Sequence, residues 1–391
     1  MKLLNRLILK SIIISLILFI QVSFIHAQLQ EIGCGNDLDK VSYTFLKGKK
    51  FIFDERPGRS DKFGGWTTPI GSNLVLNRIQ RAGFNVFSPC IWHGNGALYA
   101  AGKDIPREKQ FEEQSNRQDN DAFYHLIKEA HSRNIQVYAW FCVSLRDPPL
   151  NFLTDFYDKT ETPNRAFDIH RPNFRRYIVD VMVDIVKNYD IDGFLLDMIR
   201  TQGICTCAFC QQEYKKIYHE DLLIDAKFWR INPAAKQRLG KWQRDAVSEI
   251  VSDFSLRAKA LKPNLKITAA GHPDVEFDQL HYNGRDLVYW FNKGWLDFIM
   301  AMDYDQKLKH EGYTKILPKL KDPAGLVIIV GNYDKSESNN LPMILSRDPL
   351  LVNKLTRESI EMYKSKAVGI YWYYSLSNEQ IEILSSSTFR E

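Results

Sequence analysis

An aspartate stands at the end of an apolar run in the middle of the chain. The stretch Ile191 to Arg200 reads IDGFLLDMIR, in which apolar residues and a glycine separate Asp192 from Asp197. Burying a carboxylate without a partner is costly, so Asp197 is either paired, for instance with the nearby Arg200, or positioned for a reaction. We predict an acid/base role for Asp197 and an anchoring role for Asp192, at the other end of the run.

Polar and aromatic side chains follow several other apolar runs. The segment WHGNGALY contains Trp92, His93 and Asn95, and its glycines permit close approach of the backbone to a ligand. Flat rings and nearby hydrogen-bonding groups are suited to binding sugars, although packing in a buried loop is the alternative. The further candidates for sugar contact at the ends of later runs are Trp140, Arg200, His272, Tyr304, Asn332 and Trp372.

Three of the six cysteines fall within the six residues CTCAFC. Cys205, Cys207 and Cys210 suit a structural zinc site, for which His219 is the candidate fourth ligand. A disulfide with one further pairing, to Cys34, Cys90 or Cys142, is the second interpretation, and free thiols are the third. Because no second CxxC motif is present, the sequence leaves the three interpretations open.

Eight apolar runs alternate with amphipathic segments along the chain. The runs are 50–55, 84–92, 135–143, 192–197, 265–271, 296–304, 325–333 and 367–374, and helical patterns cover 73–83, 121–134, 173–189, 242–263, 351–366 and 378–387. Near-continuous apolar strands are typical of parallel sheets covered on both faces. Eight such units predict an α/β fold, the (β/α)8 TIM barrel, over residues 50–391, in preference to an open doubly wound sheet. Long insertions are expected after strands 2, 3 and 4, at 94–120, 144–171 and 200–241.

The first 27 residues have the layout of a secretory signal peptide. Lys2, Arg6 and Lys10 precede an apolar stretch, and Ala27 stands where a peptidase would cut. A membrane anchor is the alternative, but no basic stop-transfer segment follows. We therefore expect an exported, periplasmic or secreted protein with no membrane association after cleavage, and an N-terminal extension at 28–49. The 52 basic and 47 acidic residues nearly cancel, and no basic cluster with interleaved aromatics suggests nucleic acid.

Four blocks of the sequence, in this order, resemble one known family. They are DAFYHLIKEAHSRNIQVYAWF, YIVDVMVDIVKNYDIDGFLLDMIR, AKALKPNLKITAAGHP and GWLDFIMAMDYD. Their order and spacing are similar to those of the family 10 glycosylhydrolase-like proteins, which are exported (β/α)8 barrels of bacteria. The resemblance implies cleavage of a glycosidic bond in a bacterial or dietary glycan. The chain departs from the pattern after Asp197, where it reads Met198-Ile199-Arg200, and after the fifth run, where it reads AAGHP.

Glycoside hydrolysis usually needs two carboxyl groups. With Asp197 as one, we predict Asp303 as the second, followed by Asp305 and then by Glu55 or Asp54. The MAMDYD segment is similar to the Met-x-Tyr-Asp run that lines the sugar site of family 18 chitinases, which favours Tyr304 and Asp305 as sugar contacts. Catalysis of this kind requires no cofactor, and the sequence leaves a retaining or an inverting outcome open. The alternatives are a carbohydrate-binding barrel that has lost hydrolysis and, less well supported, a hydrolase that acts through a metal at the cysteines.

Overall fold

A computed structural model describes most of the chain after residue 42. The described ranges are 43–55, 65–94, 96–111, 121–147, 153–273, 283–338, 341–362 and 366–390. The predicted signal peptide, most of the predicted extension, Cys34 and Asn95 lie outside them. The chain divides after Thr44, and the unit from Phe45 to Glu391 contains every strand given below. Among the described residues, no helix combines the length and the apolar character that crossing a bilayer requires.

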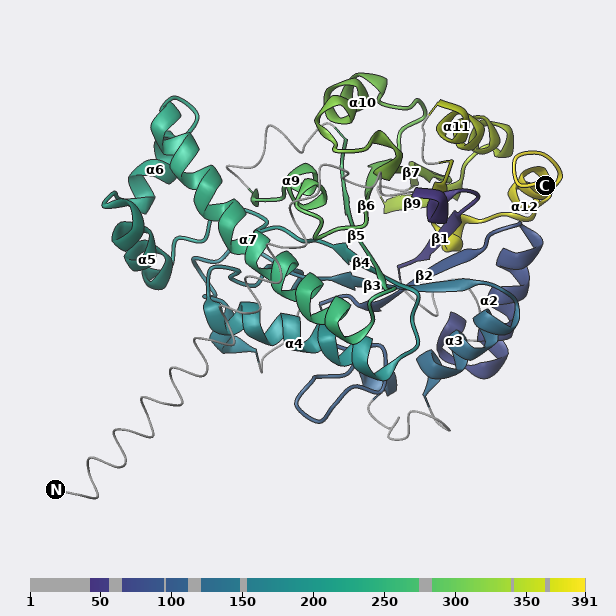
Figure 1. Ribbon diagram of the computed structural model, residues 1–391, viewed down its shortest axis with the longest axis horizontal. Coiled ribbons are helices and arrows are strands. Elements are labelled where there is room, and N and C mark those ends of the chain that lie inside the picture. Colours follow the sequence, from purple (N-terminus) through teal and green to yellow (C-terminus); the bar gives the residue numbers. More distant parts are fainter. Residues whose placement is uncertain are drawn as a thin grey trace, which may run out of the picture. The chain divides into compact units, whose positions relative to one another are not determined.

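Eight parallel strands close into a barrel, as the sequence predicted (Figure 1). They are β1 (Lys50–Asp54), β2 (Val86–Trp92), β3 (Gln136–Cys142), β4 (Gly193–Asp197), β5 (Lys266–Gly271), β6 (Phe298–Asp303), β7 (Leu326–Gly331) and β10 (Val368–Tyr371). Each strand pairs with its neighbours in chain order, and β10 returns to pair with β1. Because all the strands run in one direction, their carboxyl ends meet on one face, which carries the active site in enzymes of this fold.

Helices cover the outside of the strands (Figure 1). They are α2 (Pro69–Arg81), α3 (Ala122–Ser132), α4 (Pro172–Asn188), α7 (Pro233–Leu261), α9 (Leu287–Asn292), α10 (His310–Ile316), α11 (Pro349–Met362) and α12 (Asn378–Ser386). Short 3-10 turns occupy Tyr43–Leu46, Gly65–Thr67, Lys109–Phe111, Thr154–Phe156, Leu317–Lys319, Pro323–Gly325 and Tyr373–Ser375. Local sequence marks several helix starts: Asp121 accepts hydrogen bonds from the first turn of α3, and Ser377 and Gln380 form a capping box at α12.

Alternate residues of the strands fill the barrel with rings. Phe51, Tyr138 and Phe298 contact one another with ring centroids 5.3 to 6.3 Å apart. A side chain at Gly193 would place its Cβ 2.1 Å from the ring of Tyr138, so glycine is required there. The next residues along β1 and β3 that point inward are Phe53 and Trp140, whose rings meet edge to face. This alternation fixes which residues reach the carboxyl-end face from inside the barrel.

Two additions extend the eight-unit plan. After β4, α5 (Ala208–Tyr218) and α6 (Leu222–Phe228) precede the long α7 and lie beside its first half (Figure 1). After β7, the antiparallel strands β8 (Tyr333–Ser338) and β9 (Leu341–Ser346) form a hairpin. The sequence did not predict this hairpin, because β8 reads YDKSES and is polar at most positions.

Candidate active site at the carboxyl ends of the strands

Asp197 is the last residue of β4 and is held by two donors. The indole Nε1 of Trp140 donates to its Oδ2 over 3.1 Å, and the backbone N–H of Met198 donates to its Oδ1 over 2.7 Å. Side chains alternate along a strand, and Leu195, like its partner Trp140 on β3, points into the barrel. Asp197 is two residues after Leu195 and therefore also points inward. The residue is 8% exposed, and its carboxylate is therefore oriented before any ligand arrives.

The backbone turns sharply directly after Asp197. Met198 has a φ of +47°, a conformation that costs free energy for a residue other than glycine. The Met198 carbonyl accepts hydrogen bonds from the Ser144 hydroxyl (2.6 Å) and from the Arg200 backbone N–H (3.0 Å). The guanidinium of Arg200, a predicted sugar contact, lies 3.1 Å from the sulfur of Met198. These contacts hold the turn and thereby fix the direction of the Asp197 side chain.

A second carboxylate, Glu55, follows the end of β1. His93 lies between it and Asp147: the His93 Nε2 is 3.0 Å from a Glu55 oxygen, and the Nδ1 is 3.1 Å from an Asp147 oxygen. Arg165 donates to Asp147 from the other side, with its Nε at 2.8 Å. The Tyr371 hydroxyl donates to the other Glu55 oxygen. Glu55 is thus one end of a chain of polar contacts that runs through His93 to Asp147 and Arg165.

Three tyrosine rings pack together next to Glu55 and Trp140. Tyr304 stacks on Tyr371 with centroids 4.8 Å apart, and Tyr333 packs against both rings. Burial raises the pKa of Tyr304 well above its ordinary value, and the negative charges of Asp197 and Glu55 add to this effect. Burial likewise raises the pKa of Tyr371, followed by the charge of Glu55. Both phenols are therefore neutral, and the Tyr371 hydroxyl donates to Glu55.

We call Glu55, His93, Trp140, Asp197, Tyr304 and Tyr371 the barrel mouth. Four of these residues, Asp197, Trp140, His93 and Tyr304, were predicted site residues, and Glu55 was a lower-ranked candidate for the second carboxylate. A fifth predicted residue, His272, lies beside the mouth, with its ring 6.3 Å from that of Tyr304 and its Nδ1 3.1 Å from the Met302 carbonyl oxygen.

Asp303 does not join the barrel mouth. It is fully buried at the end of β6, where its Oδ2 accepts hydrogen bonds from the Lys309 N–H (2.7 Å) and the Tyr313 hydroxyl (2.9 Å). Burial raises the pKa of Asp303. Because side chains alternate along a strand and Tyr304 points inward, Asp303 points outward, towards α10. This geometry argues against the predicted pairing of Asp303 with Asp197.

Four other predicted contacts also lie away from the mouth. Trp92 is fully buried and stacks on Phe141. Asn332 is fully buried and accepts a hydrogen bond from the Trp372 backbone N–H while bonding to Gln380 of α12. Trp372 is 4% exposed and supports Tyr371 by stacking on it, with centroids 5.2 Å apart. The exposed Asp305 pairs with Lys309.

Sequence reasoning missed Asp147 and Tyr371 and ranked Glu55 behind Asp303. Glu55 carried a usable signal, since it follows Phe51 and Phe53 at the spacing of one strand face. Tyr371 is one of four consecutive aromatic residues, YWYY, and the pattern alone does not distinguish them. Asp147 lies in an irregular segment and meets His93 only through the tertiary fold.

The three cysteines of the CTCAFC motif meet an aspartate from another loop. The ligand atoms of Cys205, Cys207, Cys210 and Asp168 all lie within 4.8 Å of one another, and all four residues are buried. None of the five described cysteines forms a disulfide. His219, the predicted fourth ligand, is exposed at the end of α5 and is not part of this group, so that expectation was wrong. We call Asp168, Cys205, Cys207 and Cys210 the cysteine cluster.

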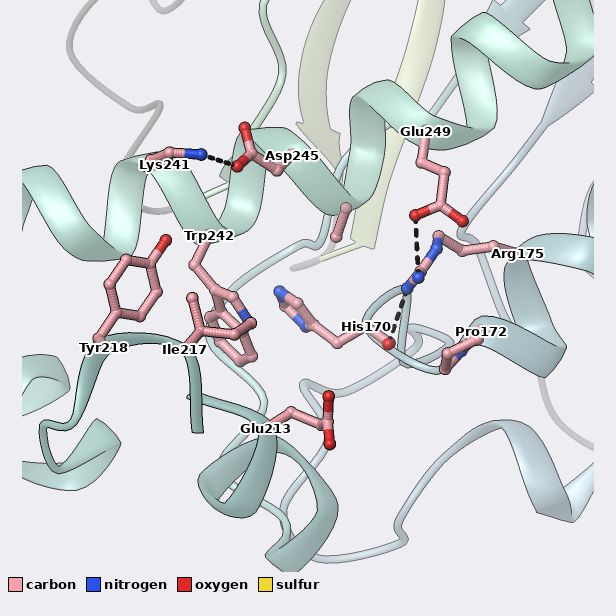
Figure 2. A pocket seen from close by; sticks show the side chains of 11 residues that line it. His170, Pro172, Arg175, Glu213, Ile217, Tyr218, Lys241, Trp242, Asp245 and Glu249 are labelled. Carbon is pink, nitrogen blue, oxygen red and sulfur yellow. Dashed lines mark hydrogen bonds and ion pairs between the residues drawn. The ribbon is translucent and has the colours of Figure 1, made fainter. Parts of the chain in front are cut away.

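A cavity of about 250 Å³ lies near this cluster, between the start of α4, α5 and α7 (Figure 2). Its wall includes the pair Arg175–Glu249 and the ring of His170, which stacks on Trp242 at a centroid distance of 3.5 Å. Outer helices and the loop before α4 line this cavity, and no residue of the barrel mouth does. We therefore assign the candidate chemistry to the mouth.

Comparison with known proteins agrees with this architecture. Residues 66–316 match the family described as glycosyl hydrolase-like 10. Glycosyl hydrolase YngK of Bacillus subtilis (strain 168) is 23% identical over 258 residues, which cover 59% of this chain and 48% of YngK, so the chain spans about half the length of that curated relative.

Solved structures of low identity share the fold. The glycoside hydrolase domain of PgaB (BpsB) from Bordetella bronchiseptica superimposes with a TM-score of 0.61 at 12% identity, covering 86% of this chain and 98% of that one. The catalytic domain of β-amylase from Paenibacillus polymyxa gives 0.55 at 9% identity, with 86% and 95% covered. The match to the family, over well more than half of the chain, confirms the resemblance seen in the sequence: the chain belongs to the glycosyl hydrolase-like 10 family.

Proposed function

We propose that the protein is a glycoside hydrolase in which Asp197 and Glu55 are the two catalytic carboxyl groups. The observation that carries the proposal is that neighbouring side chains link these two acids at the ends of β4 and β1: Trp140 donates to Asp197 and packs on Tyr371, which donates to Glu55. Glycosidic bond cleavage requires one group that protonates the leaving oxygen and one that attacks the sugar or activates water. Membership of the glycosyl hydrolase-like 10 family supports the same reaction class.

Glu55 is suited to the acid/base role because it is coupled to His93. A neutral imidazole carries one N–H and can donate to only one of its two flanking carboxylates at a time. With that proton directed to Asp147, the Nε2 is an acceptor for a proton on Glu55. After Glu55 gives this proton to the leaving oxygen it regains one from water, while the His93 Nδ1–H stays on Asp147, whose negative charge Arg165 stabilises.

Asp197 is suited to act on the anomeric carbon. Trp140 and the Met198 N–H fix its two oxygens, so the carboxylate pays little ordering cost when the substrate binds. A charged oxygen held at the mouth of the barrel also stabilises the positive charge that develops on the sugar ring in the transition state.

The half-buried rings of Tyr304, Tyr333 and Tyr371 are suited to contact the sugar. Their faces offer apolar surface, and the hydroxyls of Tyr304 and Tyr333 offer hydrogen-bond donors, which matches the mixed character of a pyranose. Under this proposal, Trp372 acts on the substrate only by supporting Tyr371. The substrate class that we propose is an oligosaccharide or polysaccharide of bacterial or dietary origin, reached after export, and catalysis needs no metal or cofactor.

A panel of oligosaccharides labelled at the reducing end tests the proposal. We expect product from the wild-type protein, and none above background from Asp197→Asn. Binding of a glycan by both proteins without product from either would instead favour a carbohydrate-binding barrel, a function that the unusual residues after Asp197 leave as the second candidate. Export is tested separately, by fractionating cells that express the full chain.

A further inference from the structure

We propose that Cys205, Cys207, Cys210 and Asp168 bind one structural Zn²⁺ that fastens the segment after β4 to the loop after β3. This inference does not depend on the proposed glycosidase activity. It replaces the fourth ligand expected from the sequence, His219, with a carboxylate that is 37 positions before Cys205 in the chain.

The spacing of the four ligand atoms fits a tetrahedral ion. With Zn–S bonds of about 2.3 Å and a Zn–O bond of about 2.0 Å, the edge between a sulfur and the oxygen is about 3.5 Å. The Asp168 Oδ2 lies 3.4 Å from the Cys210 sulfur and 3.6 Å from the Cys207 sulfur. Three sulfurs and one carboxylate oxygen within 4.8 Å of one another leave room for one ion and too little for a multi-iron cluster.

The ligand atoms favour zinc over other common metal ions. Thiolates are soft ligands that favour zinc over Ca²⁺ or Mg²⁺, which prefer oxygen. All four residues are buried, with Cys210 and the Asp168 side chain fully so. A site with four protein ligands and no solvent-exposed position is structural, whereas a catalytic zinc keeps one position open.

Neighbouring groups complete such a site. Three thiolates and a carboxylate would leave a zinc complex with a net charge of about −2, by addition of the formal ligand charges. The Arg171 guanidinium offsets part of this charge: its Nε lies 3.1 Å from the Asp168 Oδ2 and its terminal nitrogen 3.8 Å from the Cys207 sulfur. The backbone N–H of His170 donates to the other Asp168 oxygen over 3.2 Å, and outer hydrogen bonds of this kind orient ligating carboxylates.

An ion at this position would link two loops of the protein. Cys207 is the N-cap of α5 and Cys210 lies in its first turn, where the helix dipole favours thiolates. Asp168 belongs to the loop before α4, and the same two loops also meet where Thr206 bonds to Glu161. The cysteines form a small core with Tyr214, Leu222, Leu239 and Trp242. A core of this size gains much of its stability from a cross-link.

Metal analysis of the full chain, purified without a metal-affinity tag, tests the proposal. We expect one zinc per chain, and X-ray absorption with three sulfur neighbours at about 2.3 Å and one oxygen at about 2.0–2.2 Å. Cys210→Ser should weaken zinc binding at least about 100-fold against a competing chelator. Cys90→Ala, which removes a buried cysteine outside the cluster, is the matched control and should keep the full zinc content.

Two substitutions of Asp168 test whether this residue binds the metal or only packs beside the cysteines. Asp168→Asn should lower zinc affinity, and Asp168→Cys should retain one zinc with four sulfur neighbours, because a thiolate can replace the carboxylate. If the serine or asparagine variant does not fold, the wild-type metal content and absorption spectrum still decide. Wild-type protein that holds no metal and in which Cys205, Cys207 and Cys210 all react as free thiols would overturn the proposal. A disulfide within the motif, or stoichiometric iron in place of zinc, would do the same.

Discussion

The barrel mouth and the insert after β4 (residues 200–241) are built in different ways. At the mouth, Asp197 and Trp140 occupy neighbouring parallel strands whose hydrogen bonds fix their relative height. The insert has no strands, and side-chain contacts join α5, α6 and α7: Tyr214 and Arg238 both bond to Asp225. A sheet therefore positions functional groups through its backbone, whereas the insert depends on a few specific side chains.

The largest expected effect is a loss of kcat when Asp197 in the barrel mouth is replaced. Asp197→Asn keeps an oxygen that can accept the Trp140 hydrogen bond but removes the negative charge. We expect kcat to fall by about 10²–10⁴ on any substrate that the wild-type protein cleaves. Circular dichroism should be unchanged, and a variant that retains half of the wild-type kcat would exclude Asp197 from the chemistry.

The identity of the second carboxylate is the next test. Glu55→Gln should lower kcat about 100-fold, since the amide still meets His93 and Tyr371 but transfers no proton. Asp303→Asn is its control, because Asp303 bonds only to Lys309 and Tyr313 in its described hydrogen bonds. We expect its kcat to stay within about threefold of wild type. The reverse result would restore Asp303 as the partner of Asp197.

The donor to Asp197 should have a smaller effect. Trp140→Phe removes the Nε1–H but keeps most of the ring that packs on Phe53. A hydrogen bond to a charged group contributes about 1.5–3 kcal/mol, so kcat should fall roughly 10- to 100-fold. An increase in KM alone would mean that Trp140 binds substrate and does not orient the acid.

In the insert, removing one partner of an ion pair should lower the stability of the protein and leave its activity unchanged. Arg238→Met leaves the buried Asp225 without its two-point ion pair, at 2.7 Å for both contacts. Breaking a buried pair costs about 3–5 kcal/mol, so the thermal midpoint should fall by roughly 5–10 °C. Limited proteolysis should then cut within 200–241 first. A lower kcat at temperatures below the unfolding transition would show that the insert helps to shape the barrel mouth.

The smallest expected effect concerns pH. The folded-state pKa of Asp303 is raised, chiefly by burial, so the protonated form is favoured in the folded protein. Its contribution to stability is complete below the unfolded pKa of about 3.9 and is lost as pH rises through the folded pKa. Asp303→Asn should therefore show a weaker fall in the free energy of unfolding above pH 4 than wild type. Parallel curves from urea unfolding would contradict the shift.

Much of the fold was predictable from local pattern. All eight barrel strands were expected within about two or three residues of their ends, because buried parallel strands are apolar throughout. That same uniformity concealed the direction of each side chain. Asp303 and Tyr304 are adjacent in the sequence and point to opposite faces of β6, and no polar alternation marks which is which. The helices α5 and α6 were missed because their apolar faces cover only a small core.

The sequence by itself determined the eight strand–helix units and the family, and it marked Asp197 and the three clustered cysteines as candidates, because each depends on residues that are close along the chain. Only the tertiary structure decided that Glu55 joins Asp197, that His93 is shared with Asp147, and that Asp168 meets the cysteines. These partners are brought together by barrel closure and loop packing, and the inward or outward direction of a strand residue follows from a register that is fixed only when the sheet is formed.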